Sequence, residues 1–275
     1  MELWPQHWQA TGSLWHRGYC YCVIRRNRPR SASLRPRIMG ALTIAALALA
    51  ASVPAAAGTS QVPGRAVVLS NERTFTRWAH PRHAGVIRAA PSPASPRVGF
   101  LHMLTEEALP EVYLLLEQVS LPNGESWVKL RIPGRPNGVT GWVPIGDLAG
   151  MHVTEWALRV NLALLRATLY RGGRAAWSAP IGVGAPATPT PTGHFWVREL
   201  LRVPGQTIYG PYAFGTSDYS VLSEWPRGGV VGIHGTDQPS LIPGRPSHGC
   251  IRMRNADILY LARHLPIGAP VHIVG

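Results

Sequence analysis

The sequence predicts a mostly β protein, with a small N-terminal β-barrel followed by a larger β-rich domain of sandwich or barrel type. From about residue 86, short apolar stretches alternate with segments dense in Gly, Pro and Asn, which is typical of short strands and turns. Helical spacing of apolar residues appears only near the C-terminus, so we expect only a few short helices. The 275 residues are 45% hydrophobic, enough to bury a substantial core.

Residues 1–57 have the parts of a leader and signal peptide. Arg35 and Arg37 precede the apolar run IMGALTIAALALAASV, and the small residues PAAAG follow it. The run is short for a membrane-spanning helix, which needs about 20 apolar residues. We therefore expect cleavage after Ala57 and export to the periplasm or cell wall. Retention as an uncleaved membrane anchor stays open.

The segment ahead of the apolar run is unusual for a signal peptide, since it contains several tryptophans, a Cys-x-Cys pair and an arginine cluster. Translation could therefore start at Met39. The alternative is a long cytoplasmic leader, and neither version gives the segment any chemistry.

Charge and cysteine content follow from the same cleavage. Cleavage would remove seven arginines and Glu2 with residues 1–57. The whole chain has 27 basic and 14 acidic residues, so 20 basic and 13 acidic residues would remain. The remaining net charge of +7, without a lysine-rich or aromatic-basic tract, favours weak association with an anionic cell wall over nucleic-acid binding. Cys250 becomes the only cysteine, and a lone cysteine in an exported protein points to a reactive thiol.

Residues 58–85 lack periodicity and are predicted to be a linker. Residues 86–150 contain the apolar stretches VYLLLEQV, SWVKLRI and GWVPIGDL, separated by the turn segments SLPNGE and PGRPNGVT. The string Gly141-Trp142-Val143-Pro144, with Asp147 and Leu148 after it, resembles the last strands of a bacterial SH3-like domain. An unrelated β-barrel or an extension of the next domain stays open.

Residues 153–275 form the second predicted domain. Strands are expected in ALRVNLALLRATLY, AAWSAPIGVG, the segment after ATPTPTG, GGVVGIHG and the closing GAPVHIVG. Asn255 is expected to cap a short helix. One face of this helix would carry four apolar residues, Ile258, Leu261, Ala262 and Leu265.

Cys250 and His234 are the residues best suited to acyl-transfer chemistry. Such chemistry needs a thiolate, a base that generates it, and donors for the developing oxyanion. His234 ends an apolar strand 16 residues before Cys250. Gly249 allows a tight turn in which its amide and that of Cys250 could point toward a substrate oxygen.

The segment GIHGT at 232–236, followed by SHGCIRMRN at 247–255, resembles the signature of YkuD-type L,D-transpeptidases, and TPTGHF at 190–195 extends the likeness. The resemblance implies a cysteine enzyme that acts on peptidoglycan stem peptides outside the cytoplasmic membrane, without a cofactor. Cys250 would attack the carbonyl of the L-configured third residue of a tetrapeptide stem and expel D-alanine. An amine of a neighbouring stem would then take the acyl group in a 3→3 cross-link.

The resemblance also implies roles for the residues around the thiol. His234 would be the base, oriented by the backbone carbonyl of Gly235, and backbone amides of His248, Gly249 and Cys250 would line the oxyanion hole. Two further residues of the motif have less specific expected roles: Ser247 would hydrogen-bond near His234 or the substrate, and Arg252 would support the site electrostatically or bind a substrate carboxylate.

Several alternatives stay open. Tyr209 and Tyr212 could form a substrate-covering flap or be ordinary loop or core aromatics. A zinc site from the two histidines and the cysteine of the motif is disfavoured by its ligand count; the other histidines, His194, His264 and His272, are expected to be structural or exposed. The acyl acceptor could also be water, giving an L,D-carboxypeptidase, or the amine of another protein, giving protein anchoring. A non-catalytic wall-binding protein is the remaining class.

Overall fold

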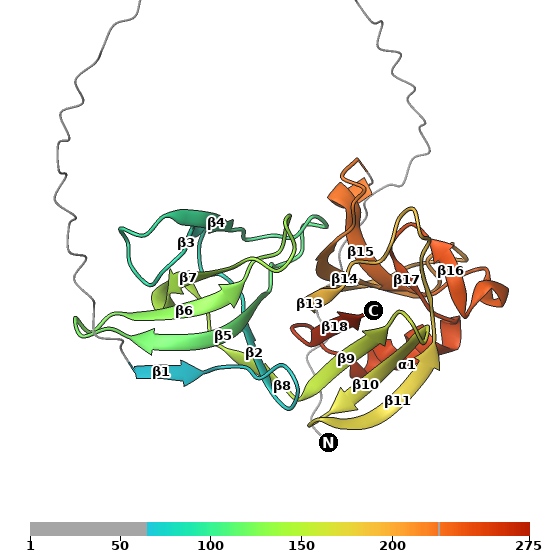
Figure 1. The fold of residues 1–275 in the computed structure, drawn as a ribbon, viewed down its shortest axis with the longest axis horizontal. Coiled ribbons are helices and arrows are strands. Elements are labelled where there is room, and N and C mark those ends of the chain that lie inside the picture. The colour runs from blue at the N-terminus through green and yellow to red at the C-terminus, as the bar shows by residue number, and fades with distance from the viewer. Residues whose placement is uncertain (1–64, 225) are drawn as a thin grey trace, which may run out of the picture. The chain divides into compact units, whose positions relative to one another are not determined.

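The computed structural model describes residues 65–224 and 226–275, all within one structural unit, Gly58–Gly275. The chain is mostly β, as predicted, and forms two sheets that follow one another in the sequence (Figure 1). Among the described residues, no helix is long and apolar enough to cross a membrane. The leader and signal peptide predicted over residues 1–57 lies outside the described residues.

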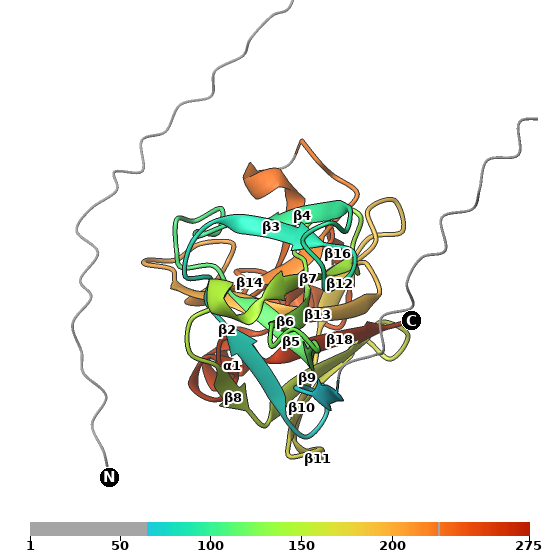
Figure 2. The ribbon, with the colours of Figure 1, turned by 90° about the vertical axis from the view of Figure 1, so that its left-hand side faces the viewer.

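The first sheet is antiparallel, in the order β4-β3-β7-β6-β5-β2-β8, with β1 also paired to β5. Figure 2 shows this order from β4 and β3 at the top to β2 and β8 at the bottom. A short 3-10 helix, Ile145–Asp147, follows β7. The strands are β1 (Arg65–Val68), β2 (Thr76–Ala79), β3 (Gly85–Arg88), β4 (Arg97–Leu101), β5 (Tyr113–Ser120), β6 (Ser126–Arg131), β7 (Thr140–Pro144) and β8 (His152–Thr154).

The predicted turns fall between these strands. The segment SLPNGE closes the hairpin of β5 and β6, where Gly124 has a φ of +86° that favours glycine. Apolar side chains from the strands then meet in one core that includes Ile87, Tyr113, Val128 and Val143. The resemblance of this sheet to an SH3-like domain stays a prediction.

The prediction of a linker over residues 58–85 is wrong for its described part, because β1 and β2 belong to the first sheet. Each has only four residues, and β1 leaves Val67 and Val68 exposed, so neither strand has a periodic apolar signal. Their pairing with β5 and β8 is long-range and cannot be read from local sequence. The first sheet also extends to Thr154, just past the predicted boundary between the domains.

The second sheet has ten strands in the order β11-β10-β9-β18-β13-β14-β15-β17-β12-β16. Three of its pairings are parallel: β9 with β18, β15 with β17, and β12 with β16. The strands are β9 (Trp156–Asn161), β10 (Arg166–Arg171), β11 (Arg174–Pro180), β12 (Gly182–Gly184), β13 (Gly193–Arg202), β14 (Tyr212–Tyr219), β15 (Val230–His234), β16 (Gly244–Ser247), β17 (Ile251–Arg252) and β18 (Pro270–Val274).

Helix α1 (Asn255–His264) covers part of the second sheet's core, and two 3-10 helices lie at Pro226–Gly229 and Pro239–Leu241. As predicted, α1 buries one apolar face, with Ile258 and Leu261 inaccessible to solvent. The predicted cap is wrong: Arg254 occupies the N-cap position and Asn255 begins the helix. The Asn255 side chain bonds outside the helix instead, to the amide of Thr236.

A small apolar cluster joins the two sheets. It contains Val112 and Leu114 from the first sheet's side and Trp196 from β13, whose indole N–H donates to the Val112 carbonyl at 2.7 Å. Beside it, the buried guanidinium of Arg198 pairs with the buried carboxylate of Glu111. The two sheets are therefore packed against each other and are not separated by a linker.

Candidate active site

The parallel pairing of β15 and β17 brings His234 and Cys250 together. In this register His234 lies opposite Arg252, and Ile233 lies opposite Ile251. The two isoleucines are fully buried in the core. Because side chains alternate along a strand, His234 and Arg252 point to the other face, and Cys250, which directly precedes β17, joins them there.

Gly232 lies between the imidazole and the thiol. Its amide donates a hydrogen bond to Cys250 Sγ at 3.4 Å. A Cβ atom on Gly232 would be 3.8 Å from His234 Cδ2 and 3.9 Å from Cys250 Sγ, so both side chains border the same small space above this glycine. Cys250 is half-buried. An N–H donor at sulfur favours the thiolate over the thiol.

The His234 ring is buried and fixed in orientation. Its Nδ1 lies 2.6 Å from the Gly235 carbonyl, the contact expected from the sequence. A carbonyl can only accept, so Nδ1 carries the proton and Nε2 is left as the basic nitrogen. Burial lowers the pKa of His234 to about 4, the Gly235 hydrogen bond opposes this shift, and the positive charge of Arg252 adds to it. The imidazole is therefore neutral at neutral pH.

Ser247 and Thr190 fix the turn that carries Cys250. Ser247 Oγ donates to the Cys250 carbonyl at 2.5 Å and accepts from the Gly249 amide at 3.2 Å. Thr190 Oγ1 donates to the Gly249 carbonyl at 2.7 Å and accepts from the Gly184 amide at 2.9 Å. Gly249 has a φ of +121°, which only glycine adopts without strain. The thiol is thus presented from a rigid turn.

Two expectations differ from this geometry. The Gly249 amide, predicted to face a substrate oxygen, bonds to Ser247 Oγ. Ser247, expected to bond near His234 or the substrate, is 2% exposed, and its hydroxyl bonds within the turn, to the Cys250 carbonyl and the Gly249 amide. Hydroxyls of serine commonly stabilise such turns by local bonds to backbone groups. His248 is exposed at the same turn.

The three remaining predicted residues lie differently relative to His234. Arg252 lies on the same face of the sheet as His234, and its positive charge lowers the pKa of His234. The buried Nε of Arg252 has no hydrogen-bond partner among the described residues. Tyr209 stands edge-on to the His234 ring, with ring centroids 5.0 Å apart, and is 45% exposed. Tyr212 instead begins β14 and packs against the core. Only Tyr209 therefore has the placement of a covering residue.

A contact from the first sheet was not foreseen. Arg135, in the loop between β6 and β7, donates two hydrogen bonds to the Ser220 carbonyl, at 2.6 and 3.1 Å, and one to the Gly228 carbonyl at 2.7 Å. Ser220 in turn packs on the turn of Cys250, because a Cβ on Gly249 would lie 3.2 Å from Ser220 Cβ. No local sequence signal could have joined residues 85 positions apart.

These observations define a class: a mostly β domain with a cysteine and a histidine on adjoining parallel strands. The family model of the YkuD L,D-transpeptidase catalytic domain matches residues 155–273, which coincide with the second sheet and α1. The chain is 35% identical over 156 residues to the putative L,D-transpeptidase YkuD of Bacillus subtilis, covering 57% of this chain and 79% of that protein. The chain belongs to the L,D-transpeptidase family of YkuD type.

Other relatives are matched over less of their length. The chain is 39% identical to the putative L,D-transpeptidase YkuD of Bacillus licheniformis, over 42% of this chain and 63% of that one. It is 31% identical to the probable L,D-transpeptidase ErfK/SrfK of Salmonella typhimurium, over 42% of this chain and 43% of that protein.

Solved structures that resemble the chain include an L,D-transpeptidase mutant of Enterococcus faecium. It is 28% identical, the match covers 43% of this chain and 49% of that chain, and the TM-score is 0.35. Another is an L,D-transpeptidase from Mycobacterium smegmatis, which is 13% identical over 55% of this chain and 91% of that chain, with a TM-score of 0.38.

The L,D-transpeptidase family acts by transpeptidation, an acyl transfer, on peptidoglycan stem peptides.

Proposed function

We propose that this chain cross-links peptidoglycan stem peptides, with Cys250 as the nucleophile and His234 as its base. The observation that carries the proposal is the common space above Gly232, bordered by Cys250 Sγ and the His234 ring. Family membership supports the reaction class, and the site supports these two roles. His234 suits the role of base because it is neutral at neutral pH and its Nδ1 is already bonded.

In the first half-reaction, His234 Nε2 takes the thiol proton of Cys250, and Sγ forms a bond to the carbonyl carbon of the third, L-configured residue of a tetrapeptide stem. The bond from this carbon to the nitrogen of the terminal D-alanine breaks, and that nitrogen takes the proton from His234. The stem is then held on Cys250 as a thioester.

In the second half-reaction, a side-chain amine of a neighbouring stem attacks the thioester carbonyl. The amine loses a proton to His234, the carbon–sulfur bond breaks, and the thiol is restored with a 3→3 cross-link as product. Backbone amides of the Cys250 turn would stabilise the oxyanion in both halves. The Gly249 amide would first have to leave Ser247 Oγ.

The test is the full chain incubated with purified tetrapeptide muropeptides and followed by mass spectrometry. We expect dimers that have lost one D-alanine, none with Cys250→Ala, and a rate lower by about 10²- to 10⁴-fold with His234→Ala. His83→Ala, an exposed histidine paired with Asp147 in the first sheet, is the matched control and should retain activity. Tripeptides alone would indicate hydrolysis by an L,D-carboxypeptidase. Full turnover by Cys250→Ala would contradict the catalytic assignment.

Export is a separate proposal that rests on the sequence of residues 1–57. A reporter fused after residue 60 should be found outside the cytoplasm, whereas a strictly cytoplasmic reporter would contradict export. Weak wall association through the first sheet is likewise proposed from the basic charge. Sedimentation of Cys250→Ala with purified cell walls at low and high salt tests it, and salt-insensitive or absent binding would oppose it.

A further inference from the structure

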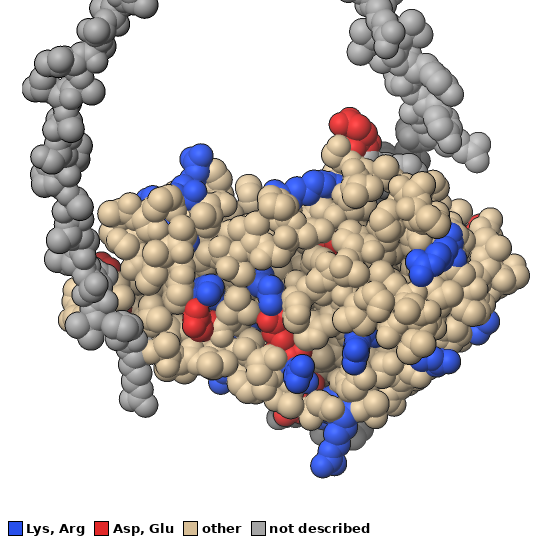
Figure 3. Space-filling model, viewed as in Figure 1, with Lys and Arg blue, Asp and Glu red and all other residues tan. Residues whose placement is uncertain are grey.

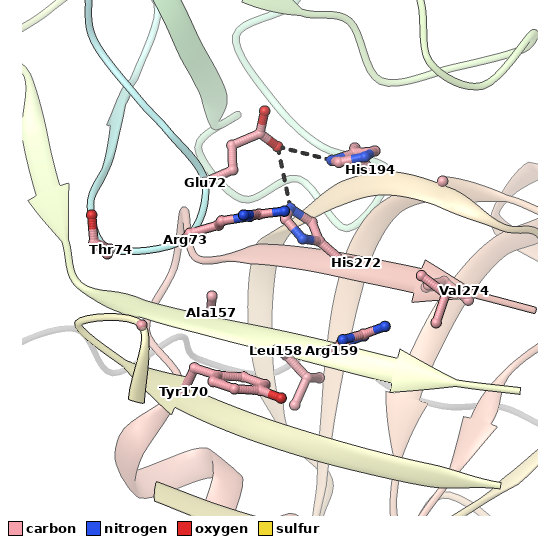
Figure 4. Close-up of a pocket in the computed structure, with 13 residues that line it drawn as sticks. Glu72, Arg73, Thr74, Ala157, Leu158, Arg159, Tyr170, His194, His272 and Val274 are labelled. Atoms are coloured by element: carbon pink, nitrogen blue, oxygen red, sulfur yellow. Dashed lines mark ion pairs between the residues drawn. The ribbon is translucent and has the colours of Figure 1, made fainter. Parts of the chain in front are cut away.

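A second cluster of ionisable side chains lies away from Cys250, where the first sheet's β1–β2 turn meets the second sheet. Glu72 comes from that turn, His194 from β13 and His272 from β18, and the two histidines are direct partners in the strand register. Figure 4 shows the three side chains pointing toward one another. They line part of a cavity of about 660 Å³. Neither His234 nor Cys250 lines this cavity.

The distances within the cluster suit a metal ion. Glu72 Oε2 is 3.6 Å from His194 Nδ1 and 3.6 Å from His272 Nε2, and one ligand atom from each residue lies within 4.8 Å of the others. Both 3.6 Å separations are too long for hydrogen bonds. They are close to the roughly 3.4 Å between neighbouring ligand atoms that bond lengths of about 2.0–2.1 Å give in a tetrahedral zinc site.

Burial adds a second observation. Glu72 is 8% exposed, and the Nε2 atom of His272 is buried without a hydrogen-bond partner among the described residues. A buried polar atom left without a partner costs free energy. A metal ion between Glu72 and His272 would satisfy this nitrogen.

We propose that Glu72, His194 and His272 form a zinc site that ties the β1–β2 turn to β13 and β18. Two imidazoles and one carboxylate match the ligands of zinc, whereas calcium and magnesium prefer oxygen. The adjoining cavity gives the ion an entry path and room for a water as fourth ligand. This departs from the expectation that His194 and His272 are merely structural or exposed.

Positive charges near the cluster oppose the ion. Arg73 and Arg159 line the same cavity, and Arg131 bonds directly to Glu72. Arg131 donates to Glu72 Oε1 at 2.8 Å and more weakly to Oε2 at 3.3 Å. Oε2 is the atom that faces both histidines, so the shorter arginine bond uses the other oxygen. A carboxylate can bind a metal through one oxygen while a partner holds the second, which is a common outer-shell arrangement. Arg131 would therefore weaken the site and also orient its carboxylate.

The test uses the full chain carrying Cys20→Ser, Cys22→Ser and Cys250→Ser, so that no thiol is left to bind metal. Zinc content after equilibrium dialysis should be one ion per chain, and cobalt(II) at the same site should give visible absorption bands without a thiolate charge-transfer band. His272→Gln should weaken zinc binding by about 10-fold or more. His83→Gln, from the exposed His83–Asp147 pair, is the matched control and should leave it unchanged.

His194→Gln provides a second variant. The His194 side chain is 57% exposed, so its replacement should not disturb folding. It should also lose zinc binding and the rise in melting temperature that zinc gives the parent. Failure of the cysteine-free parent to bind zinc, or full binding by both glutamine variants, would overturn the site. The reactivity of Cys250 is tested separately, by carbapenem acylation of the chain that retains Cys250. The result of that test does not depend on His272, so the zinc site and the proposed function can fail independently.

Discussion

Asn255 Oδ1 accepts a hydrogen bond from the Thr236 amide at 2.9 Å, so the first residue of α1 holds the segment that follows His234. Gly210 and Gly235 both lie close to Asn255 Oδ1, and a side chain on either glycine would collide with this oxygen. Gly235 supplies the carbonyl that orients the His234 ring. Asn255 therefore acts through the backbone on His234, the proposed base.

Replacing Asn255 by Ala should slow acylation of Cys250 by a carbapenem by about 10- to 100-fold, because a base misplaced by about 1 Å loses activity on that scale. Asn255→Asp keeps an oxygen acceptor and should recover part of the rate. Asn123→Ala is the control, because Asn123 likewise accepts from a backbone amide, but in a turn of the first sheet. Equal rates in Asn255→Ala and Asn123→Ala, measured by intact-protein mass, would contradict the role.

Gly232→Ala should separate activity from stability. Its Cβ would be in ordinary van der Waals contact with His234, Cys250 and the Phe214 carbonyl, so the fold can accept it at a cost of about 1 kcal/mol or less. The methyl would nevertheless fill the space that a substrate carbonyl must enter.

We therefore expect the melting temperature of Gly232→Ala to stay near that of the parent while carbapenem acylation falls at least about 10-fold. Gly146→Ala, at a glycine with nothing within 4 Å of its Cβ position, should change neither property. An unchanged acylation rate in Gly232→Ala would show that the substrate enters elsewhere.

The buried His234 should make stability depend on pH. Its pKa is lowered from 6.5 to about 4 in the folded protein. Between these values the unfolded chain binds a proton that the folded chain does not, so stability is present above pH 6.5 and is lost as the pH falls toward 4. The loss amounts to about 3 kcal/mol at most.

Urea unfolding of the parent and of His234→Gln at pH 7 and pH 4.5 isolates this effect, because all other titrating groups are common to both proteins. The parent should lose more stability than the variant on acidification. A difference between the two proteins that stays constant with pH would mean that His234 keeps an ordinary pKa.

Arg135 lies in a loop of the first sheet but should affect the rate of the reaction at Cys250. Its three hydrogen bonds hold the Ser220 and Gly228 carbonyls beside the turn of Cys250. Arg135→Ala should reduce kcat by about 10-fold or more through a displaced turn, with a smaller change in KM. Arg135→Lys, which keeps the charge and one donor group, should recover part of the loss. Arg97→Ala is the control and should leave kcat unchanged, because the Arg97 guanidinium lies over the Phe100 ring within the first sheet.

The parts of the protein that could be predicted from sequence are those with local signals. Apolar runs between turn segments predict β5 to β7, β9 to β11, β13, β15 and β18, and the residues around His234 and Cys250 indicate their chemistry. Strands β1 and β2 escape prediction because they pair with residues of β5 that are 49 to 55 positions away for β1 and 34 to 38 positions away for β2. The meeting of His194 with His272 has the same cause, since strand register across 78 residues brings them together.

The buried pair of Arg198 and Glu111 should be the costliest contact to break between the two sheets. Both residues are at most 3% exposed, and Arg198 Nε donates to Glu111 Oε1 at 2.8 Å. Glu111→Ala should lower the free energy of unfolding by about 3–5 kcal/mol, because it leaves a buried guanidinium without its main partner. Glu155→Ala breaks the exposed pair with Arg171 and should cost about 1 kcal/mol or less. If urea unfolding gave equal costs for the two variants, the pair would contribute no more than a surface contact. The packing of the sheets would then rest on other contacts, such as the cluster around Trp196 and the hydrogen bonds of Arg135.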